Sequence, residues 1–167
     1  NKTSIVILSY NTYNLTKSCI ESIRKFTPAG SYEIIVIDNA SQDASVAWLK
    51  RQKDIKLVCN KENKGFPGGC NQGMELAEEG NDILLLNSDT IVTPRWLENM
   101  QIALYSEPQV GAVSCITNNC SNWQKIEVDY KDYDEMIAFA KKINHSKPAL
   151  WEIRPRLVGF CYLIKNE

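Results

Sequence analysis

The chain has 167 residues, which suits one domain that buries a substantial hydrophobic core. Nineteen basic against twenty acidic residues give a formal charge of -1, which argues against a strongly basic nucleic-acid-binding protein and against a polyacidic tail. No apolar run approaches the roughly 18 residues of a membrane-spanning helix, so we expect no transmembrane segment and no nucleic-acid partner. The sequence begins at Asn1 with no signal-peptide pattern, so we expect a piece of a longer protein.

Six cysteines are scattered along the sequence and form no CxxC pair. This pattern predicts buried, reduced thiols of a cytosolic protein. His145 is the only histidine, and no ligand spacing surrounds it, so a zinc site and a Cys–His catalytic pair are disfavoured. The cysteines are Cys19, Cys59, Cys70, Cys115, Cys120 and Cys161.

Four apolar runs alternate with helical patterns along the first ninety-five residues. Each run is continuous, as expected of a parallel strand that is covered on both faces. The strands are predicted at 5–8, 34–37, 55–59 and 83–86. The helices are predicted at 13–27, after a capping Ser41, after a glycine-rich turn at 63–69, and from Thr93-Pro94.

The rest of the chain has a weaker pattern. A fifth strand is predicted at 110–116 and a final strand at 157–164, separated by a long polar excursion with a candidate strand at 125–128. Hydrophobic spacing predicts one further helix at 132–144. The alternation of strands and helices indicates an α/β sheet with mostly right-handed crossovers.

Three of the predicted strands end in polar residues. The first runs into Ser9-Tyr10-Asn11, the second into Asp38-Asn39, and the fourth into Asn87-Ser88-Asp89-Thr90. Each set alone suits a turn or a helix cap. Because the carboxyl ends of parallel strands share one edge, where ligands of α/β sheets bind, three such ends together favour a binding cleft.

The composition of this cleft narrows its ligand. Asp38 and Asp89 would repel a phosphate unless a cation intervened, and Asp89 suits Mg²⁺ or Mn²⁺, which bind through one or two carboxylates plus substrate phosphates. Asp38 suits a base or a ribose. Neither GxxxxGK[ST] nor a GxGxxG after the first strand is present, which disfavours NTPases of the Walker type and NAD-binding proteins. The glycine-rich turn suits a helix entry and a ligand contact equally.

Four blocks of the sequence resemble, in order and spacing, the family 2 glycosyltransferases with the GT-A fold. The resemblance implies an α/β, Rossmann-like, mostly parallel sheet flanked by helices, in a single domain over 1–167 that is truncated at its C-terminus. It assigns 1–95 to the binding of a nucleotide-sugar donor and 96–167 to a partial acceptor side. The blocks are Ile5–Asn11, Ile34–Ser45, Asn63–Gly73 and Asp82–Pro94.

The resemblance also implies roles for single residues. Asp89 would bind the metal, Mg²⁺ or Mn²⁺, in a DxD-like motif whose first acid is replaced by Asn87. The family's acidic catalytic base follows the last strand, so we expect it beyond Glu167 and expect this chain alone to lack it. The residues implied to bind the nucleotide are Ser9, Tyr10, Asn11, Asp38, Asn39, Asn63, Gly65, Asn87 and Ser88.

The expected function is an inverting, metal-assisted glycosyltransferase of the hexosyltransferase type. It would move sugar from a nucleotide-diphosphate sugar to a hydroxyl of a saccharide or lipid-linked saccharide, in bacterial cell-surface polysaccharide synthesis, in the cytoplasm and near the membrane. One alternative is a nucleotidyltransferase that makes sugar nucleotides. Another is a noncatalytic carbohydrate-binding module, with Trp123, Trp151, Tyr130 and Tyr133 as a stacking surface; partial burial of these rings is the simpler interpretation.

Overall fold

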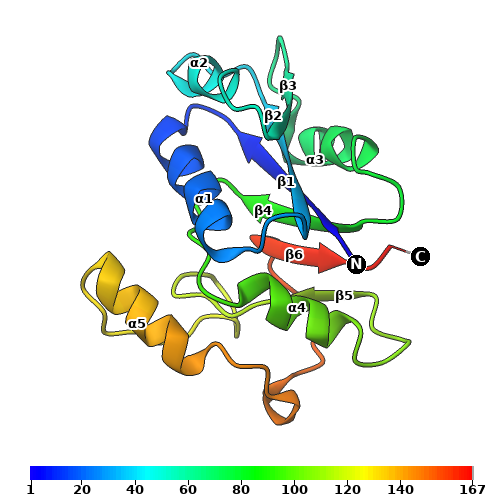
Figure 1. The fold of residues 1–167 in the computed structure, drawn as a ribbon, viewed down its shortest axis with the longest axis vertical. Coiled ribbons are helices and arrows are strands. Elements are labelled where there is room, and N and C mark those ends of the chain that lie inside the picture. Colours follow the sequence, from blue (N-terminus) through cyan, green and yellow to red (C-terminus); the bar gives the residue numbers. More distant parts are fainter. Residues whose placement is uncertain (167) are drawn as a thin grey trace.

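A computed structural model describes residues 1–166, which form a six-stranded sheet in the order β3-β2-β1-β4-β6-β5 (Figure 1). The first four strands are parallel, β6 is antiparallel to β4, and β5 is antiparallel to β6. The mostly parallel sheet predicted from the sequence is therefore confirmed. The strands are β1 (Thr3–Ser9), β2 (Tyr32–Asp38), β3 (Ile55–Cys59), β4 (Asp82–Asn87), β5 (Ala112–Ser114) and β6 (Cys161–Ile164).

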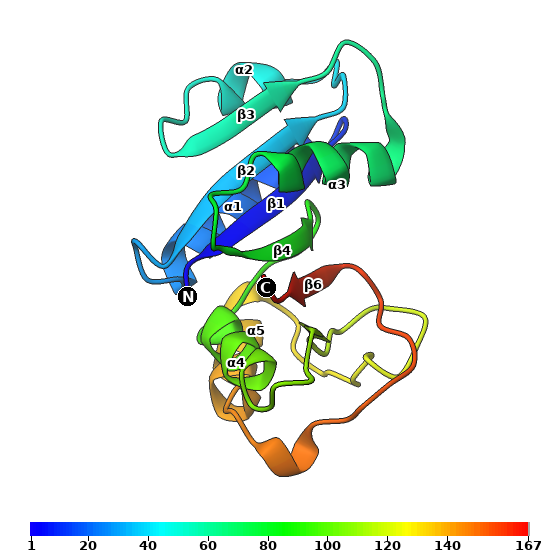
Figure 2. The same cartoon turned by 90° about the vertical axis from the view of Figure 1, so that its right-hand side faces the viewer.

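Helices cover both faces of the sheet (Figures 1 and 2). Figure 2 shows α3 on the face opposite α1. No helix within residues 1–166 has both the length and the apolar character needed to cross a membrane. The helices are α1 (Tyr13–Phe26), α2 (Ser45–Leu49), α3 (Gly65–Glu75), α4 (Trp96–Leu104) and α5 (Tyr133–Ile143), with a 3₁₀ turn at Pro148–Leu150.

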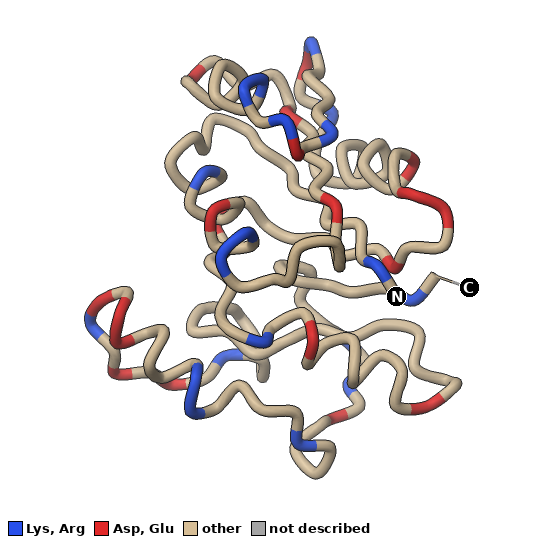
Figure 3. The backbone as a smooth tube through the Cα atoms, viewed as in Figure 1, with Lys and Arg blue, Asp and Glu red and all other residues tan. Residues whose placement is uncertain are grey.

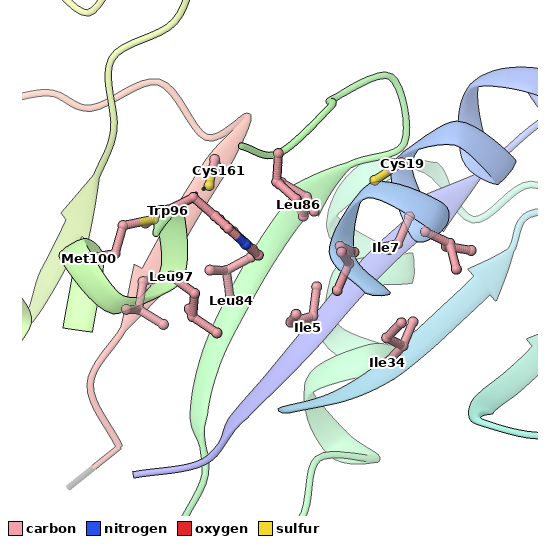
Figure 4. Packing of buried hydrophobic residues seen from close by; sticks show 14 of the residues in the cluster. Ile5, Ile7, Cys19, Ile34, Leu84, Leu86, Trp96, Leu97, Met100 and Cys161 are labelled. Atoms are coloured by element: carbon pink, nitrogen blue, oxygen red, sulfur yellow. Dashed lines mark hydrogen bonds between the residues drawn. The ribbon is translucent and has the colours of Figure 1, made fainter. Parts of the chain in front are cut away.

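The main core lies between the sheet and helices α1, α2 and α4, and Figure 4 shows its residues from the strands, α1 and α4. Alternate residues of each strand point to opposite faces, so Ile5 and Ile7 enter this core while Val6 packs on the other face. The Trp96 indole N–H donates to the Thr27 hydroxyl at 2.9 Å, which ties α4 to the end of α1. Packing of these helices on the buried strands fixes the positions of the carboxyl ends of the strands.

The smaller core on the other face depends on glycine. A Cβ on Gly73 would lie 2.2 Å from Cγ1 of Val6, and a Cβ on Gly69 would lie 2.8 Å from Cδ2 of Leu8. Glycine therefore lets α3 pack closely on the side chains of β1. The predicted turn at 63–69 is wrong in this respect, because the helix already begins at Gly65 and tolerates Pro67 in its first turn.

Several predicted boundaries also need correction. The strand at 110–116 shortens to β5, the strand at 157–164 shortens to β6, and 125–128 contributes only a single bridge between Thr117 and Lys125. The helix predicted from Thr93-Pro94 begins at Trp96, because Arg95 adopts a left-handed conformation with φ 65°. By contrast, the helix at 132–144 is confirmed as α5, capped by the Asp132 carboxylate, which accepts from the Glu135 N–H at 2.9 Å.

The cysteines are free, as expected, but they are not all buried. Cys59 is exposed, and Cys115 and Cys120 are partly exposed. Cys59 ends the short β3, which lies at the edge of the sheet, so its side chain is not covered.

Candidate functional site

The register of the parallel strands brings the three polar strand ends together. Ser9 pairs with Asp38 across β1 and β2, and Leu8 pairs with Asn87 across β1 and β4. The Asn39 N–H then donates to the Ser9 carbonyl at 2.8 Å, which continues the ladder past the end of β2. The edge predicted to form a cleft is therefore one continuous surface built by β1, β2 and β4.

A chain of hydroxyl groups crosses this edge beneath the surface. Ser9 is fully buried and shares a hydrogen bond with Thr16 (3.1 Å), which shares one with Thr12 (3.0 Å). Thr12 in turn lies 3.4 Å from the Ser88 hydroxyl in the turn after β4. Ser9 is thus engaged inside the protein, whereas the neighbouring Tyr10 is half exposed.

Asn11 joins the loop after β1 to the loop after β2. Its φ of 54° is left-handed, its N–H donates to the Ser41 hydroxyl at 2.9 Å, and its Oδ1 accepts from the Gln42 N–H at 2.7 Å. The Ser41 hydroxyl is thereby occupied, and the predicted capping by Ser41 is wrong, because α2 begins only at Ser45. The side chain of Asn11 holds two of the predicted site segments together.

Asp43 is a functional candidate that the sequence did not single out. Its carboxylate accepts from the Tyr13 N–H and from the Ser45 N–H, both at 2.9 Å, so it serves the first turns of α1 and α2. Burial pushes the pKa of Asp43 upward, but the hydrogen bonds from Ser45 and Tyr13 outweigh it, and the net pKa lies below its ordinary value. A shallow hollow of about 430 Å³ lies here, lined by residues 11–15, 43 and 44.

Asp38 lies fully buried at the end of β2. Its Oδ1 accepts from the Ser41 N–H at 2.8 Å, which closes a tight turn around Ala40, whose φ is 69°. Its Oδ2 is buried and has no hydrogen-bond partner within residues 1–166. A buried acceptor without a partner is costly in a folded protein, so this oxygen is a candidate for contact with a ligand.

Asn39 connects β2 to the start of α3. Its Nδ2 donates to the Gly65 carbonyl at 3.2 Å, and its Oδ1 accepts from Asn60 Nδ2 at 2.9 Å. Asn63 Oδ1 accepts from the Gly65 N–H at 2.8 Å, and Gly65 has a left-handed φ of 70°. The glycine-rich segment therefore begins its helix beside the polar strand ends.

The turn after β4 completes the edge. The Thr90 N–H donates to the Asn87 carbonyl at 3.2 Å, and the Asn87 N–H donates to the Phe160 carbonyl at 2.8 Å, just before β6. Asp89 is exposed, and its carboxylate makes no hydrogen bond or ion pair within residues 1–166. Beneath it, burial and the Asp89 charge raise the pKa of the Cys19 thiol to about 12, so that thiol stays neutral.

The side chains of this edge supply only some of the ligands that a hard divalent cation needs. Within the described chain, no three Asp, Glu, His or Cys side chains gather as metal ligands. Asp89 offers one free carboxylate, and Mg²⁺ or Mn²⁺ can bind through a single carboxylate when substrate phosphates and water supply the other oxygens. The residues present therefore fit a metal that arrives with a phosphate-bearing ligand.

Comparison with known sequences gives consistent results. The model of the family described as glycosyl transferase family 2 matches residues 4–156. Glycosyltransferase GlyG of Streptococcus pneumoniae is 30% identical over 135 residues, which are 78% of this chain and 42% of GlyG. The poly(ribitol-phosphate) beta-glucosyltransferase of Bacillus spizizenii is 32% identical over 96 residues, which are 54% of this chain and 15% of that protein. The chain thus matches well under two thirds of the length of these relatives.

Solved structures share the fold. A mannosyltransferase of Pyrobaculum calidifontis, solved with GDP-Man and Mn²⁺, has a TM-score of 0.62 at 24% identity, over 69% of this chain and 35% of that one. TarS of S. aureus, solved with UDP-GlcNAc, has a TM-score of 0.56 at 21% identity, over 64% of this chain and 32% of that one. These are GT-A glycosyltransferases, and the mixed sheet with helices on both faces is the fold they share with this chain. With the family match over most of its length, the chain belongs to glycosyl transferase family 2 and has the GT-A fold.

Proposed function

We propose that the edge formed by β1, β2, α3 and β4 binds the nucleotide of a nucleotide-diphosphate sugar, and that the whole protein transfers the sugar to an acceptor hydroxyl. The observation that carries this proposal is the buried, unpartnered Oδ2 of Asp38 on the same sheet edge as the free carboxylate of Asp89. In this proposal the first lacks a hydrogen-bond donor, which a base or ribose would supply on binding, and the second would meet a diphosphate through a cation.

The remaining edge residues take the supporting roles in this proposal. Asn11 and Asn39 hold the two loops that flank the nucleotide, and Tyr10 offers its half-exposed ring to the base. The turn of Asn63 and Gly65 lines the nucleotide pocket. The buried Ser9 acts indirectly, through the hydroxyl chain that ends at Ser88; Asn87 and Ser88 contact ribose or phosphate from the turn after β4.

A divalent cation, Mg²⁺ or Mn²⁺, belongs to this proposal. Asp89 would hold it, and Asn87 would add no charge at the position where a second acid would stand. Such a cation supplies Lewis-acid stabilisation of the diphosphate that leaves. The Mn²⁺ of the Pyrobaculum mannosyltransferase structure supports the choice of a hard cation.

The finer features of the proposal concern the whole protein. By resemblance to the family, we propose inversion at the anomeric carbon by in-line attack, hexose as the transferred sugar, and a base supplied from beyond Glu167. We assign 1–95 to donor binding and 96–167 to the acceptor side. We also propose a cytoplasmic role in bacterial cell-surface polysaccharide synthesis; bacterial glycosyltransferases among the relatives support the bacterial part of this proposal.

Thermal unfolding tests the proposal. We would measure the midpoint with UDP, dTDP, GDP and CDP, each with and without Mn²⁺. A ligand at 100 times its Kd adds about 2.7 kcal/mol, which for a domain of this size raises Tm by about 5–10 °C. We expect a metal-dependent rise with one nucleotide that is lost in Asp89→Ala and kept in Glu79→Ala, an exposed acid between α3 and β4 at the opposite edge. No rise with any nucleotide would contradict the proposal.

A further inference from the structure

A second hollow lies between two segments that the proposed donor site does not use. It has a volume of about 600 Å³ and is lined by the loop after β5 and by the segment before β6. Figure 2 shows these two segments on the side of the sheet where β5 and β6 lie. The lining residues are Cys120, Ser121, Asn122, Trp123, Lys125, Arg156 and Val158.

This hollow adjoins the proposed donor site. Val158, which lines it, stands two residues before Phe160, whose carbonyl accepts from the Asn87 N–H at 2.8 Å. Since an extended chain advances at most about 3.5 Å per residue, Val158 lies within about 7 Å of Phe160. The strand β5 runs in the same direction as β4, so the loop that follows it leaves the sheet at the edge that carries Asp89.

The walls of the hollow are held together by one buried side chain. Gln124 is nine-tenths buried, and its Nε2 donates to the Ser114 hydroxyl at 2.8 Å and to the Cys115 carbonyl at 2.9 Å. Its Oε1 accepts from the Val158 N–H at 2.6 Å. One glutamine therefore fixes the loop after β5 against the segment before β6, and the hollow is built into the fold.

The lining combines an aromatic ring with positive charge. Both charged residues that line the hollow, Lys125 and Arg156, are cations, whereas acidic and basic residues are interspersed along the rest of the chain (Figure 3). Lys125 has the Glu127 carboxylate at 3.7 Å, but Arg156 is exposed and makes no ion pair within residues 1–166. Trp123 is 64% exposed, and Arg154, a cation paired with the Glu152 carboxylate, lies 5.3 Å from its ring centre.

We propose that this hollow binds a negatively charged saccharide, which is the acceptor class of the transfer reaction. The inference rests on the proposed function, because only a donor at the neighbouring edge makes this saccharide an acceptor. The face of Trp123 suits stacking against a sugar ring, and the unpaired guanidinium of Arg156 suits a carboxylate or a phosphodiester, which planar guanidinium groups bind through paired hydrogen bonds.

Calorimetric titration of this chain tests the inference with three probes. These are pentagalacturonate, an oligomer of glycerol phosphate, and neutral maltopentaose. We expect at least one anionic probe to bind about tenfold more tightly than maltopentaose at low ionic strength and to lose that advantage at high salt. Which anion binds more tightly separates a carboxylate ligand from a phosphodiester ligand.

Matched variants locate the site. Arg156→Gln should weaken the anionic probes about fivefold to tenfold and leave maltopentaose unchanged, whereas Arg51→Gln, an exposed arginine after α2, should change nothing. Trp123→Ala should weaken all three probes. Equal affinity for charged and neutral probes, or binding of none, would overturn the inference while the nucleotide-dependent rise in Tm persists. Loss of that rise in Arg156→Gln would also overturn it, because the cation would then serve the diphosphate.

Discussion

Asn39 donates a hydrogen bond from its Nδ2 to the carbonyl of Gly65 at 3.2 Å. This bond links the end of β2 to the first residue of α3. The same side chain accepts from Asn60 Nδ2 at 2.9 Å. Removing it breaks both contacts, and each such loss costs about 1 kcal/mol. We expect Asn39→Ala to lower the free energy of unfolding in urea by about 1–2 kcal/mol and to weaken nucleotide binding.

Asn71→Ala provides the control for this variant. Asn71 is exposed on α3 and makes no side-chain hydrogen bond within the described residues. Its substitution should leave both the urea midpoint and the nucleotide-dependent rise in Tm unchanged. An Asn39→Ala protein with unchanged stability would show that the contact between β2 and α3 does not support this edge.

Gly73 should not tolerate a side chain. Its added Cβ would lie 2.2 Å from Cγ1 of Val6, a buried residue of β1, so α3 would have to move away from the sheet. Overpacking of this kind costs about 1–3 kcal/mol, and we expect Gly73→Ala to lower the urea midpoint accordingly. Gly111→Ala, where an added Cβ meets nothing within 4 Å, should change the midpoint little. Equal effects of the two substitutions would contradict the close approach of α3.

Glu33 should make stability fall at acid pH. Burial raises the pKa of Glu33, but hydrogen bonds from Lys56, Ser4 and the Glu78 N–H lower it by more than burial raises it. The net pKa therefore lies below the ordinary 4.5. Because the folded pKa is below the unfolded one, this stabilisation is present above about pH 4.5 and is lost as pH falls through the folded pKa. We expect urea midpoints measured from pH 7 to pH 3 to fall less steeply in Glu33→Gln. Parallel curves for the two proteins would rule out this contribution.

Thiol reactivity should separate the exposed cysteine from the buried ones. Burial and the Asp89 charge raise the pKa of Cys19 to about 12, and burial also raises the pKa of Cys59, but Cys59 is exposed. Since the thiolate is the reactive form and needs access, a disulfide reagent at pH 8 should modify Cys59 in the native protein and Cys19 only after unfolding. Peptide mass analysis identifies each modified residue, and Cys59→Ser should remove the modification at position 59 while the partly exposed Cys115 and Cys120 keep any reaction of their own. Native modification of Cys19 would contradict its burial.

The sequence predicted the sheet and the meeting of its polar strand ends better than it predicted the contacts there. Continuous apolar runs such as Ile34 to Ile37 indicate buried parallel strands, and parallel strands bring Asp38 and Asn87 to one edge. The burial of Ser9 and the double capping by Asp43 follow from tertiary placement of side chains, which spacing does not encode. For the capping role of Asp43, the one local signal in the sequence was an aspartate two residues before the start of α2.

The long excursion shows the same limit more strongly. Its polar composition hides the role of Gln124, which anchors the loop through five hydrogen-bonding partners, namely Ser114, Cys115, Thr117, Asn122 and Val158. The aromatic residues weighed as a stacking surface differ in burial: Trp123 is exposed beside the second hollow, so the partial burial expected of it is wrong, whereas Tyr130 is partly buried and packs on Phe139 of α5. Contacts between residues so far apart in the sequence depend on the tertiary structure, which local sequence patterns do not reveal.

Asn87→Asp tests the metal site from the other direction. The substitution places a second carboxylate two residues before Asp89, as in a motif with two acids. With Mn²⁺ present, the added charge should tighten nucleotide binding several-fold, because divalent cations of this class prefer carboxylate oxygens. Without metal, the same charge should repel the diphosphate and weaken binding.

The sign of the change therefore reports on the cation itself. Calorimetry of nucleotide binding to Asn87→Asp should show tighter binding with Mn²⁺ and weaker binding without it. Asn87→Ala should not show the tighter binding with Mn²⁺. If Asn87→Asp weakened binding equally in both conditions, the turn after β4 would contact phosphate or ribose directly. Asp89 would then repel the ligand with no cation to offset it, and the proposed metal role of Asp89 would be wrong.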